Sequence, residues 1–586
     1  MGFLVFLLAL SVYFYSAVPI IFYEDNPEFI TTAYTLGISH PSGYPLTNIL
    51  GNLAGLLPFG SFAYKCNLLS AFFGAVAVYF FYKCTVVLTK ERIFSIVATL
   101  IFMMSGNLWT QATIMEVYTL NYAFFFGIFW IALSGRLVDF RWLLLSSFLF
   151  GLGVTNHLSF ALALLPFTLL WLAKRKDWLY KMNLANFGFL LMAGCLSWFI
   201  QFYLPARSIS GAENILFSWG KVNSLNSFIS NITGAIYSDM PFNQGTMLDR
   251  VNTLVNYLIE IEIWIWIVMT FFFINGFFRM LGANISGTFA FMAGIIVYFA
   301  YSILHYSAID IMLVIPTGLA LMVIVFGAQK LDVISRYASL LMFGAITVFI
   351  ALSNSSQHDR HADFSAYDYV VDVFENIPSD GKLQLSPGHE TNFLFFYSIF
   401  GPGGVPDTSL ASDRKPFFPY IPTEKKASTN YLLYNTEPSW LEEIRDPDGW
   451  KYVRSMNIDN SHLNFAGGFL TRDAFKGVVL SRLAINKGHY FLGKGDVEKG
   501  QLFYNLAAKW HQSGVMREAA IRHSWGDVDT SIDLIEAIMR SKPSTNASAL
   551  LAKLKIERKV RDVADAKAAE EAGGDEEDFE DEGNKF

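Results

Sequence analysis

The chain has 586 residues, of which 53% are hydrophobic and only 16% are charged, whereas about 25% is usual for soluble domains. The charges are unevenly spread: residues 1–353 hold 16 Lys and Arg with 14 Asp and Glu, and residues 354–586 hold 27 and 36. This composition excludes an ordinary soluble protein, and a net charge of −7 without a basic stripe excludes a nucleic-acid partner.

Apolar runs in the first 353 residues predict membrane-spanning helices, which need about 20 apolar residues each. We count eleven, at 3–22, 66–88, 93–106, 118–135, 142–156, 158–173, 184–204, 256–277, 286–304, 309–328 and 337–353. The chain is therefore predicted to be an α-helical, multi-pass protein of the lipid bilayer with about eleven spans.

Lys and Arg gather in alternate loops, most densely at 174–181, and such loops face the cytoplasm. We therefore expect a cytoplasmic N-terminus and, with an odd number of spans, an extracytoplasmic C-terminal region. The long segments 23–65 and 205–250 then lie outside. The polar residues of the membrane part converge on this outer face, and such residues near a membrane usually mark a site.

The first candidate residues, Asp25 and Glu28, directly follow the first predicted span. Pro27 suits the first turn of a helix, with Asp25 or Asn26 as its cap and Glu28 in that turn. One interpretation is a helix cap at the membrane surface. The other is a general base, because a partly desolvated carboxylate gains basicity toward a hydroxyl proton.

A rigid turn with two prolines and a glycine, residues 40–46, carries His40 and Tyr44. His40 suits a phosphate or a sugar hydroxyl, and Tyr44 suits either substrate or the membrane interface. Between two spans lie further residues of the types that bind sugars, although an aromatic belt explains the rings equally well. They are Trp109, Gln111, Glu116 and Tyr118.

Three more candidates lie at the outer ends of predicted spans: Asn156, His157 and Arg207. Arg207 is placed for a lipid phosphate or for a headgroup contact without a role in binding, and His157 fits a structural hydrogen bond equally well. A metal site could be drawn from Asp25, Glu28, His40, Glu116 and His157, but no dense metal-ligand spacing supports it, so a metal cofactor is the less favoured alternative. The three cysteines form no CxxC pair, so we do not expect a disulfide framework.

The C-terminal part divides by composition. Residues 354–475, which include a strand predicted from Lys382, indicate a mixed α/β region, and 476–563 indicate helical hairpins. Gly495-Asp496 and Gly526-Asp527 lie near a tetratricopeptide (TPR) period, so this part is a candidate surface for a protein partner. The acidic residues 564–586 are expected to be disordered.

The motifs together resemble the transmembrane protein O-mannosyltransferase family, formerly a domain of unknown function. The resemblance is strongest over residues 20–210 and rests on Glu28-Phe-Ile, the turn from His40, Asn67-Leu-Leu-Ser-Ala71, Glu116-Val-Tyr118 and Gly153–His157. Where that family often has Gly-Asp-Ser-Gly-Glu-Phe, this chain has Glu-Asp-Asn-Pro-Glu-Phe, which leaves open whether Asp25 or Glu28 acts.

The resemblance implies a GT-C glycosyltransferase in residues 1–353. It implies a polyprenyl- or dolichyl-phosphate sugar as donor, with mannose the expected sugar and protein Ser or Thr the acceptor, in a bacterial inner membrane or the endoplasmic reticulum. The outer-loop acid is then the base, and transfer inverts the sugar. Alternatives are a lipid or polysaccharide glycosyltransferase, a transporter and an assembly scaffold.

Overall fold

The computed structural model divides the chain into two compact units, residues 1–370 with 392–421, and residues 371–391 with 422–586. It describes residues 1–174, 183–210, 218–219, 221–235, 251, 255, 263–304, 309–363, 366–367, 382–384, 393–394, 397, 432–434, 454–455, 481, 484–485, 488, 491–492, 495–510, 512–524, 526–541, 543 and 545–574. The predicted division into four domains remains a prediction.

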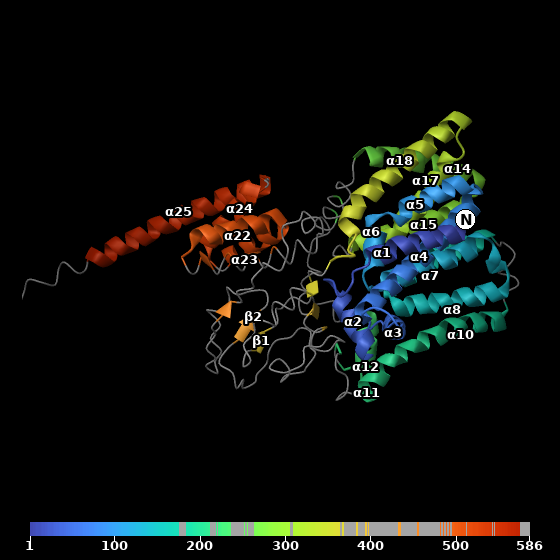
Figure 1. The fold of residues 1–586 in the computed structure, drawn as a ribbon, viewed down its shortest axis with the longest axis horizontal. Helices are drawn as coiled ribbons and strands as arrows, with labels where there is room; N and C mark the ends of the chain where they lie inside the picture. Colours follow the sequence, from blue (N-terminus) through green and yellow to red (C-terminus); the bar gives the residue numbers. More distant parts are fainter. Residues whose placement is uncertain are drawn as a thin grey trace, which may run out of the picture. The chain divides into compact units, whose positions relative to one another are not determined.

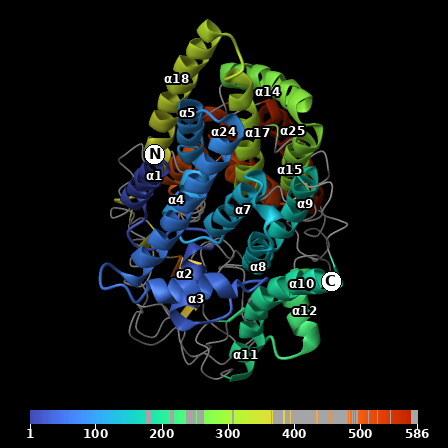
Figure 2. The ribbon, with the colours of Figure 1, turned by 90° about the vertical axis from the view of Figure 1, so that its right-hand side faces the viewer.

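The described part of the first unit is almost entirely helical (Figures 1 and 2). Its α-helices are α1 (Gly2–Ser16), α2 (Asn26–Thr35), α3 (Pro45–Ala54), α4 (Phe62–Thr89), α5 (Arg92–Met103), α6 (Gly106–Thr113), α7 (Tyr118–Leu133), α8 (Phe140–Asn156), α9 (Leu164–Lys174), α10 (Leu184–Trp198), α11 (Tyr203–Ser210), α12 (Leu225–Thr233), α14 (Ile263–Ala283), α15 (Ile285–Leu304), α16 (Ile309–Met312), α17 (Val314–Ala328) and α18 (Val333–His358). Short 3-10 helices are η1 (Arg136–Val138), η2 (Leu158–Ala163) and η3 (Phe199–Phe202).

Four stretches in the described residues are long and apolar enough to cross a membrane: Phe62–Thr89, Leu184–Ile209, Ile285–Ile303 and Val333–Ser355. The pair α5 and α6, bent by 61°, makes a fifth if it counts as one span, and five shorter apolar helices accompany them. These helices indicate a membrane protein, and the count of eleven spans remains a prediction.

Several helices end or break earlier than the apolar runs suggest, at points where proline or a bend interrupts the backbone. α1 ends at Ser16 because Pro19 disfavours helical geometry at the residue before it. The run 309–328 is split between α16 and α17, where Pro316 cannot donate a hydrogen bond to the preceding turn. The segment expected to be an outer loop after residue 106 begins as helix α6.

The core of this unit forms around α4, which packs against α1, α5, α6 and α7. Small residues on α4 allow close approach, as Gly74 does beside Ala112 of α6. Large aromatic rings fill the remaining space, and the ring centroids of Phe81 and Phe102 lie 4.2 Å apart. The core of this unit is therefore close-packed around α4.

Helices α2 and α3 lie at one end of the bundle, the same end as α11 and α12 (Figures 1 and 2). The backbone of Ile38 pairs with Ser218 in a parallel bridge, which joins the α2–α3 connection to the segment before α12. Tyr203 and Arg207 also donate hydrogen bonds to the carbonyls that end α2. This end therefore brings together segments from distant parts of the chain.

In the second unit, three short parallel strands pair in the order β1 (Lys382–Gln384), β2 (Leu432–Tyr434) and β3 (Arg454–Ser455). Lys382 is aligned with Leu432, and Leu433 with Arg454. A strand is thus found at the position predicted from Lys382. The broader α/β assignment of 354–475 falls mostly outside the described residues and remains a prediction.

The helices of the second unit are α22 (Val497–Trp510), α23 (Gln512–Ser524), α24 (Val528–Ser541) and α25 (Thr545–Gly574), around a core that includes Tyr504 and Ile535. That they form TPR-like repeats remains a prediction. Disorder from residue 564 is wrong as far as Gly574, because the alanines, Lys567 and the glutamates there are strong helix formers and continue α25. The tail beyond Gly574 lies outside the described residues.

Candidate active site

The first turn of α2 follows the expected pattern but leaves the Asp25 carboxylate available. Asp25 is the N-cap residue, Pro27 lies in the first turn and Glu28 follows it. The Asp25 side chain makes no capping hydrogen bond. Asn26 instead accepts from the backbone N–H of Phe22 at 2.8 Å, which closes the loop before the helix. A cap hydrogen bond therefore does not account for the Asp25 side chain.

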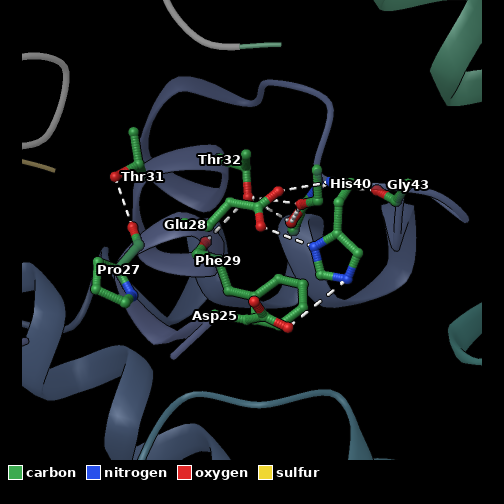
Figure 3. Close-up of polar contacts among 10 residues, drawn as sticks. Asp25, Pro27, Glu28, Phe29, Thr31, Thr32, His40 and Gly43 are labelled. Atoms are coloured by element: carbon green, nitrogen blue, oxygen red, sulfur yellow. Dashed lines mark hydrogen bonds and ion pairs between the residues drawn. The ribbon is translucent and has the colours of Figure 1, made fainter. Parts of the chain in front are cut away.

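Glu28 and His40 form a buried ion pair, drawn in Figure 3. The Glu28 carboxylate accepts the backbone N–H of His40 at 2.6 Å with Oε1 and contacts His40 Nδ1 at 2.7 Å with Oε2. The side chain of Glu28 is 0% exposed and that of His40 is 13% exposed. Both carboxylate oxygens are thus bonded to His40, one to its backbone N–H and one to its imidazole.

The second ring nitrogen of the same imidazole points toward Asp25. Nε2 of His40 lies 3.8 Å from Oδ2 of Asp25, whose side chain remains 36% exposed, and Figure 3 shows the ring between the two acids. His40 therefore lies between two different carboxylates. That of Glu28 is buried and fully hydrogen-bonded, and that of Asp25 can be reached by solvent or substrate.

The electrostatics of this group favour a cationic His40. Burial alone would lower the pKa of the imidazole, but the charges of Glu28 and Asp25 outweigh it and raise the pKa to about 9. Burial raises the pKa of Glu28, and the ion pair with His40 opposes that rise. At neutral pH we therefore describe the group as a histidine cation between two carboxylates.

The turn that presents His40 depends on Gly43. Its φ of +85° is a left-handed conformation, and a Cβ there would lie 2.6 Å from Leu204. Asn48 of α3 donates to the Gly43 carbonyl at 3.2 Å and accepts from Thr32 and Ser39. This buried network fixes the turn against α2 and α3, so the position of His40 is determined by both helices.

Aromatic rings from separate segments surround His40. Tyr44 lies edge-on to His40 at 4.9 Å and is stacked near His157 at 6.0 Å, while Tyr118 lies 5.1 Å from His157. Trp219 approaches His40 at 5.7 Å from the segment before α12. The structure thus brings four predicted residues, His40, Tyr44, Tyr118 and His157, into one aromatic cluster and adds Trp219.

Glu116 lies between α6 and α7 and is only 5% exposed. Burial raises the pKa of its carboxyl well above the usual value, and the negative charge of Asp25 raises it further. Its Oε2 has no hydrogen-bond partner among the described residues. Glu116 is therefore a buried acid whose surroundings favour the protonated form, with one oxygen that has no partner among the described residues.

Three other predicted residues bind the protein itself. Trp109 donates from its indole N–H to Ser16 at 2.7 Å, and Asn156 donates to the Val117 carbonyl at 2.8 Å. Arg207 donates from Nε to the Leu36 carbonyl at 2.6 Å and from Nη2 to that of Thr35 at 3.2 Å. These contacts give each side chain a structural role, and that of Arg207 is to complete the C-terminal end of α2.

Gln111 is also buried, at 1% exposure, and its Oε1 has no partner among the described residues. No hydrogen bond or ring contact to the His40 cluster is found for it in that part of the chain. Its predicted role in sugar binding therefore rests on sequence alone.

The candidates from the sequence did not include Asn67 of α4, which hydrogen-bonds to three separate segments next to the site. It donates to the carbonyls of Val18 and Ile20, and its Oδ1 accepts from Asn26 and from the Met115 backbone. It thereby joins the segments that carry Asp25 and Glu116. The signal was an asparagine inside an apolar run, where a polar side chain needs a specific partner.

Asp25, Glu28 and His40 also offer one metal-ligand atom each within 4.8 Å of one another. In the observed arrangement, however, His40 Nδ1 and Glu28 are bonded to each other. Metal binding by all three residues would require that pair to open, so the observed geometry fits an ion pair better than a metal site.

Comparisons with known proteins match the N-terminal part of this chain to one family. Residues 25–180 match the family described as "Protein O-mannosyl-transferase TMEM260 N-terminal domain". The chain is similar to "Protein O-mannosyl-transferase TMEM260" of Mus musculus, with 29% identity over 242 residues, which cover 39% of this chain and 33% of the mouse protein. The Dictyostelium discoideum protein of that name is 24% identical over 262 residues, which cover 41% and 31%. The matched part thus spans about a third of each relative, and the predicted resemblance is confirmed for this part.

Proposed function

We propose that this chain is a membrane glycosyltransferase, because residues 25–180 match the model of the protein O-mannosyl-transferase N-terminal domain. It moves a sugar, for which mannose is the expected identity, from a polyprenyl- or dolichyl-phosphate donor to Ser or Thr hydroxyls of a protein. The reaction takes place at the extracytoplasmic face, where the N-terminus of α2 then lies.

One observation supports this proposal most directly: the Asp25 carboxylate is uncapped, 36% exposed and next to the imidazole of His40. Glu28 is 0% exposed and holds His40 with both oxygens, one on the imidazole Nδ1 and one on the backbone N–H. A general base must reach the proton that it removes. We therefore assign the base to Asp25 and a positioning role to Glu28.

In the proposed step, the acceptor hydroxyl oxygen attacks C1 of the sugar while its proton passes to the Asp25 carboxylate. The bond between C1 and the phosphate oxygen breaks, and the lipid phosphate leaves with the electron pair. Single displacement inverts the configuration at C1. The leaving group is already good, so the protein needs a base and groups that stabilise charge on the phosphate.

The surrounding residues complete this assignment. The His40 cation attracts the Asp25 carboxylate and holds its position. Protonated Glu116 donates its hydrogen to a sugar or phosphate oxygen. Tyr44, Tyr118 and His157 offer the ring faces and hydroxyls that sugars favour. Arg207 donates from Nε and Nη2 to the carbonyls at the end of α2, so Nη1 is the nitrogen that we propose for contact with the phosphate.

The test is sugar transfer by the purified full-length chain, with radiolabelled polyprenyl-phosphate mannose and a Ser/Thr-rich acceptor peptide. Asp25→Asn keeps the shape of the side chain and removes the base, so we expect kcat to fall by about 100-fold or more. Glu91→Gln, which changes an exposed carboxylate paired with Arg336, is the matched control and should retain wild-type activity. Full activity of Asp25→Asn would refute the assignment of the base.

The same assay separates the alternatives. Transfer to lipid or polysaccharide but not to peptide would identify a different acceptor class. Donor binding without turnover would favour a scaffold or a carrier.

A further inference from the structure

The C-terminal end of α18 and the residues that follow it contact α6 and the loop after α1, next to the candidate site. We call residues 354–363, at the end of α18 and just beyond it, the strap. Asn354 donates to the Met104 carbonyl at 2.7 Å, and His358 Nδ1 lies 2.8 Å from the Thr110 hydroxyl. The strap therefore follows α6 closely, although about 250 residues separate the two in sequence.

The most buried charge of the strap is Arg360, which is 3% exposed. Its guanidinium lies over the ring of Phe22, with 4.1 Å between the guanidinium carbon and the ring centroid. Its Nη1 donates to the hydroxyl of Thr113 at 3.4 Å, and its backbone N–H donates to the Ser16 carbonyl at 3.1 Å. One side chain thus contacts the loop after α1 and the end of α6 at the same time.

Both contacts lie three residues before a candidate functional acid. Phe22 precedes Asp25, and Thr113 precedes Glu116. The two segments are also joined to each other, because Val18 donates to the Thr113 carbonyl at 3.0 Å. A shift of Arg360 would therefore be transmitted to both acids through short stretches of backbone.

A guanidinium fits this place better than another cation. Its plane can stack on an aromatic ring while its N–H groups donate at the edge, which a lysine ammonium cannot reproduce. Burying a charge without such contacts is costly. The geometry is that of a connection between two loops, since Arg360 touches a residue of each.

We infer that Arg360, a residue of the strap, is a positioning residue. It sets the distance between the loop that carries Asp25 and the loop that carries Glu116. Its effect on sugar transfer rests on the proposed function, whereas its effect on the two loops does not. A misplacement of reacting groups by about 1 Å can reduce a rate by about 100-fold. A change at Arg360 should therefore act on turnover more than on donor binding.

The experiment compares Arg360→Met, Arg360→Lys and Thr113→Val in the full-length chain in detergent. Arg336→Met is the matched control, because Arg336 also lies near an aromatic ring, at 5.5 Å from Phe94, but is 36% exposed at the other end of α18. Hydrogen exchange measured by mass spectrometry reports on loop stability without reference to activity.

For Arg360→Met we expect exchange to accelerate about tenfold in peptides covering 16–26 and 110–117, with little change in 120–133. In the transfer assay, kcat should fall by about tenfold or more while KM for the donor stays within about twofold. Arg360→Lys should recover part of the loss, and Thr113→Val should give a smaller effect of the same kind. Arg336→Met should match wild type in both assays.

Unchanged exchange in both loops of Arg360→Met would overturn the positioning role, whatever the activity. Equal losses in Arg360→Lys and Arg360→Met would overturn the part assigned to a stacked cation. If the wild-type chain transfers no sugar, the proposed function fails, and the exchange data still decide whether Arg360 holds the two loops.

Discussion

Replacing His40 by glutamine tests the central ion pair, because the substitution removes a titratable cation and keeps a side chain that can hydrogen bond. The pKa of His40 is raised from 6.5 to about 9 in the folded protein. Burial lowers this pKa, but the negative charges of Glu28 and Asp25 raise it by more. A raised pKa contributes stability below the unfolded value and loses it as the pH rises through the folded value. The stabilisation should therefore be complete below about pH 6.5 and disappear around pH 9.

The magnitude follows from the size of the shift. Each pKa unit corresponds to about 1.4 kcal/mol, so a rise from 6.5 to about 9 represents about 3 kcal/mol of stability at low pH. The groups that face His40 are Asp25, Glu28, Tyr44 and the uncharged rings of Phe29 and Trp219. Burial raises the pKa of Tyr44 well above 10, so this tyrosine stays neutral across the window.

The assay is equilibrium unfolding in mixed detergent micelles between pH 6 and pH 10, followed by tryptophan fluorescence. The difference in free energy of unfolding between wild type and His40→Gln should shrink by about 3 kcal/mol over this range. His361→Gln is the control, since His361 pairs with Asp359 at 2.7 Å but is 47% exposed, and such surface pairs contribute less than about 1 kcal/mol. A difference that stays constant from pH 6 to pH 10 for His40→Gln would refute the raised pKa.

Four other residues around the candidate site give further predictions. Gly43→Ala should destabilise the protein by about 1–3 kcal/mol in the same unfolding assay, because φ is +85° and the new Cβ meets Leu204; stability equal to wild type would contradict this geometry. Asn67→Leu should lower stability by about 3 kcal/mol or more, since buried partners lose their hydrogen bonds; a loss below about 1 kcal/mol would exclude a linking role. Arg207→Met should accelerate hydrogen exchange at the end of α2 about tenfold, and an unchanged rate would mean that its two carbonyl contacts are dispensable. Glu116→Gln should keep transfer within about threefold of wild type and Glu116→Ala should lower it at least about tenfold, because a glutamine still donates a hydrogen bond; equal losses would refute the role of Glu116 as a hydrogen-bond donor.

Local features of the candidate site could be predicted from the sequence because they depend on neighbouring residues. Pro27 with Asp25 before it and Glu28 after it specifies the first turn of α2 through backbone chemistry alone. The turn at Gly43 is equally local, since proline and glycine restrict the backbone wherever they occur. These short-range rules located the acids and His40.

The pairing of those residues could not be predicted, because it depends on how α2 and α3 fold back on each other. Glu28 and His40 are twelve residues apart, and no periodicity places them in contact. Arg207 illustrates the same limit. Its position beside the membrane suggested a phosphate, but the fold brings the end of α2 within its reach. Arg360 lies beyond the apolar helices, and no sequence pattern predicts that its side chain contacts the end of α6.

Charge balance gives these positions a common physical basis. A lipid phosphate is an anion, yet Asp25, Glu28 and Glu116 all lie near the proposed reaction. Glu28 is neutralised by His40, and burial favours the protonated form of Glu116. Asp25 is the exposed carboxylate of these three, so the site can offer a base to the acceptor without presenting three negative charges to its donor. The ion pair between Glu28 and His40 therefore does more than stabilise the fold, because it removes a charge that would otherwise repel the anionic donor.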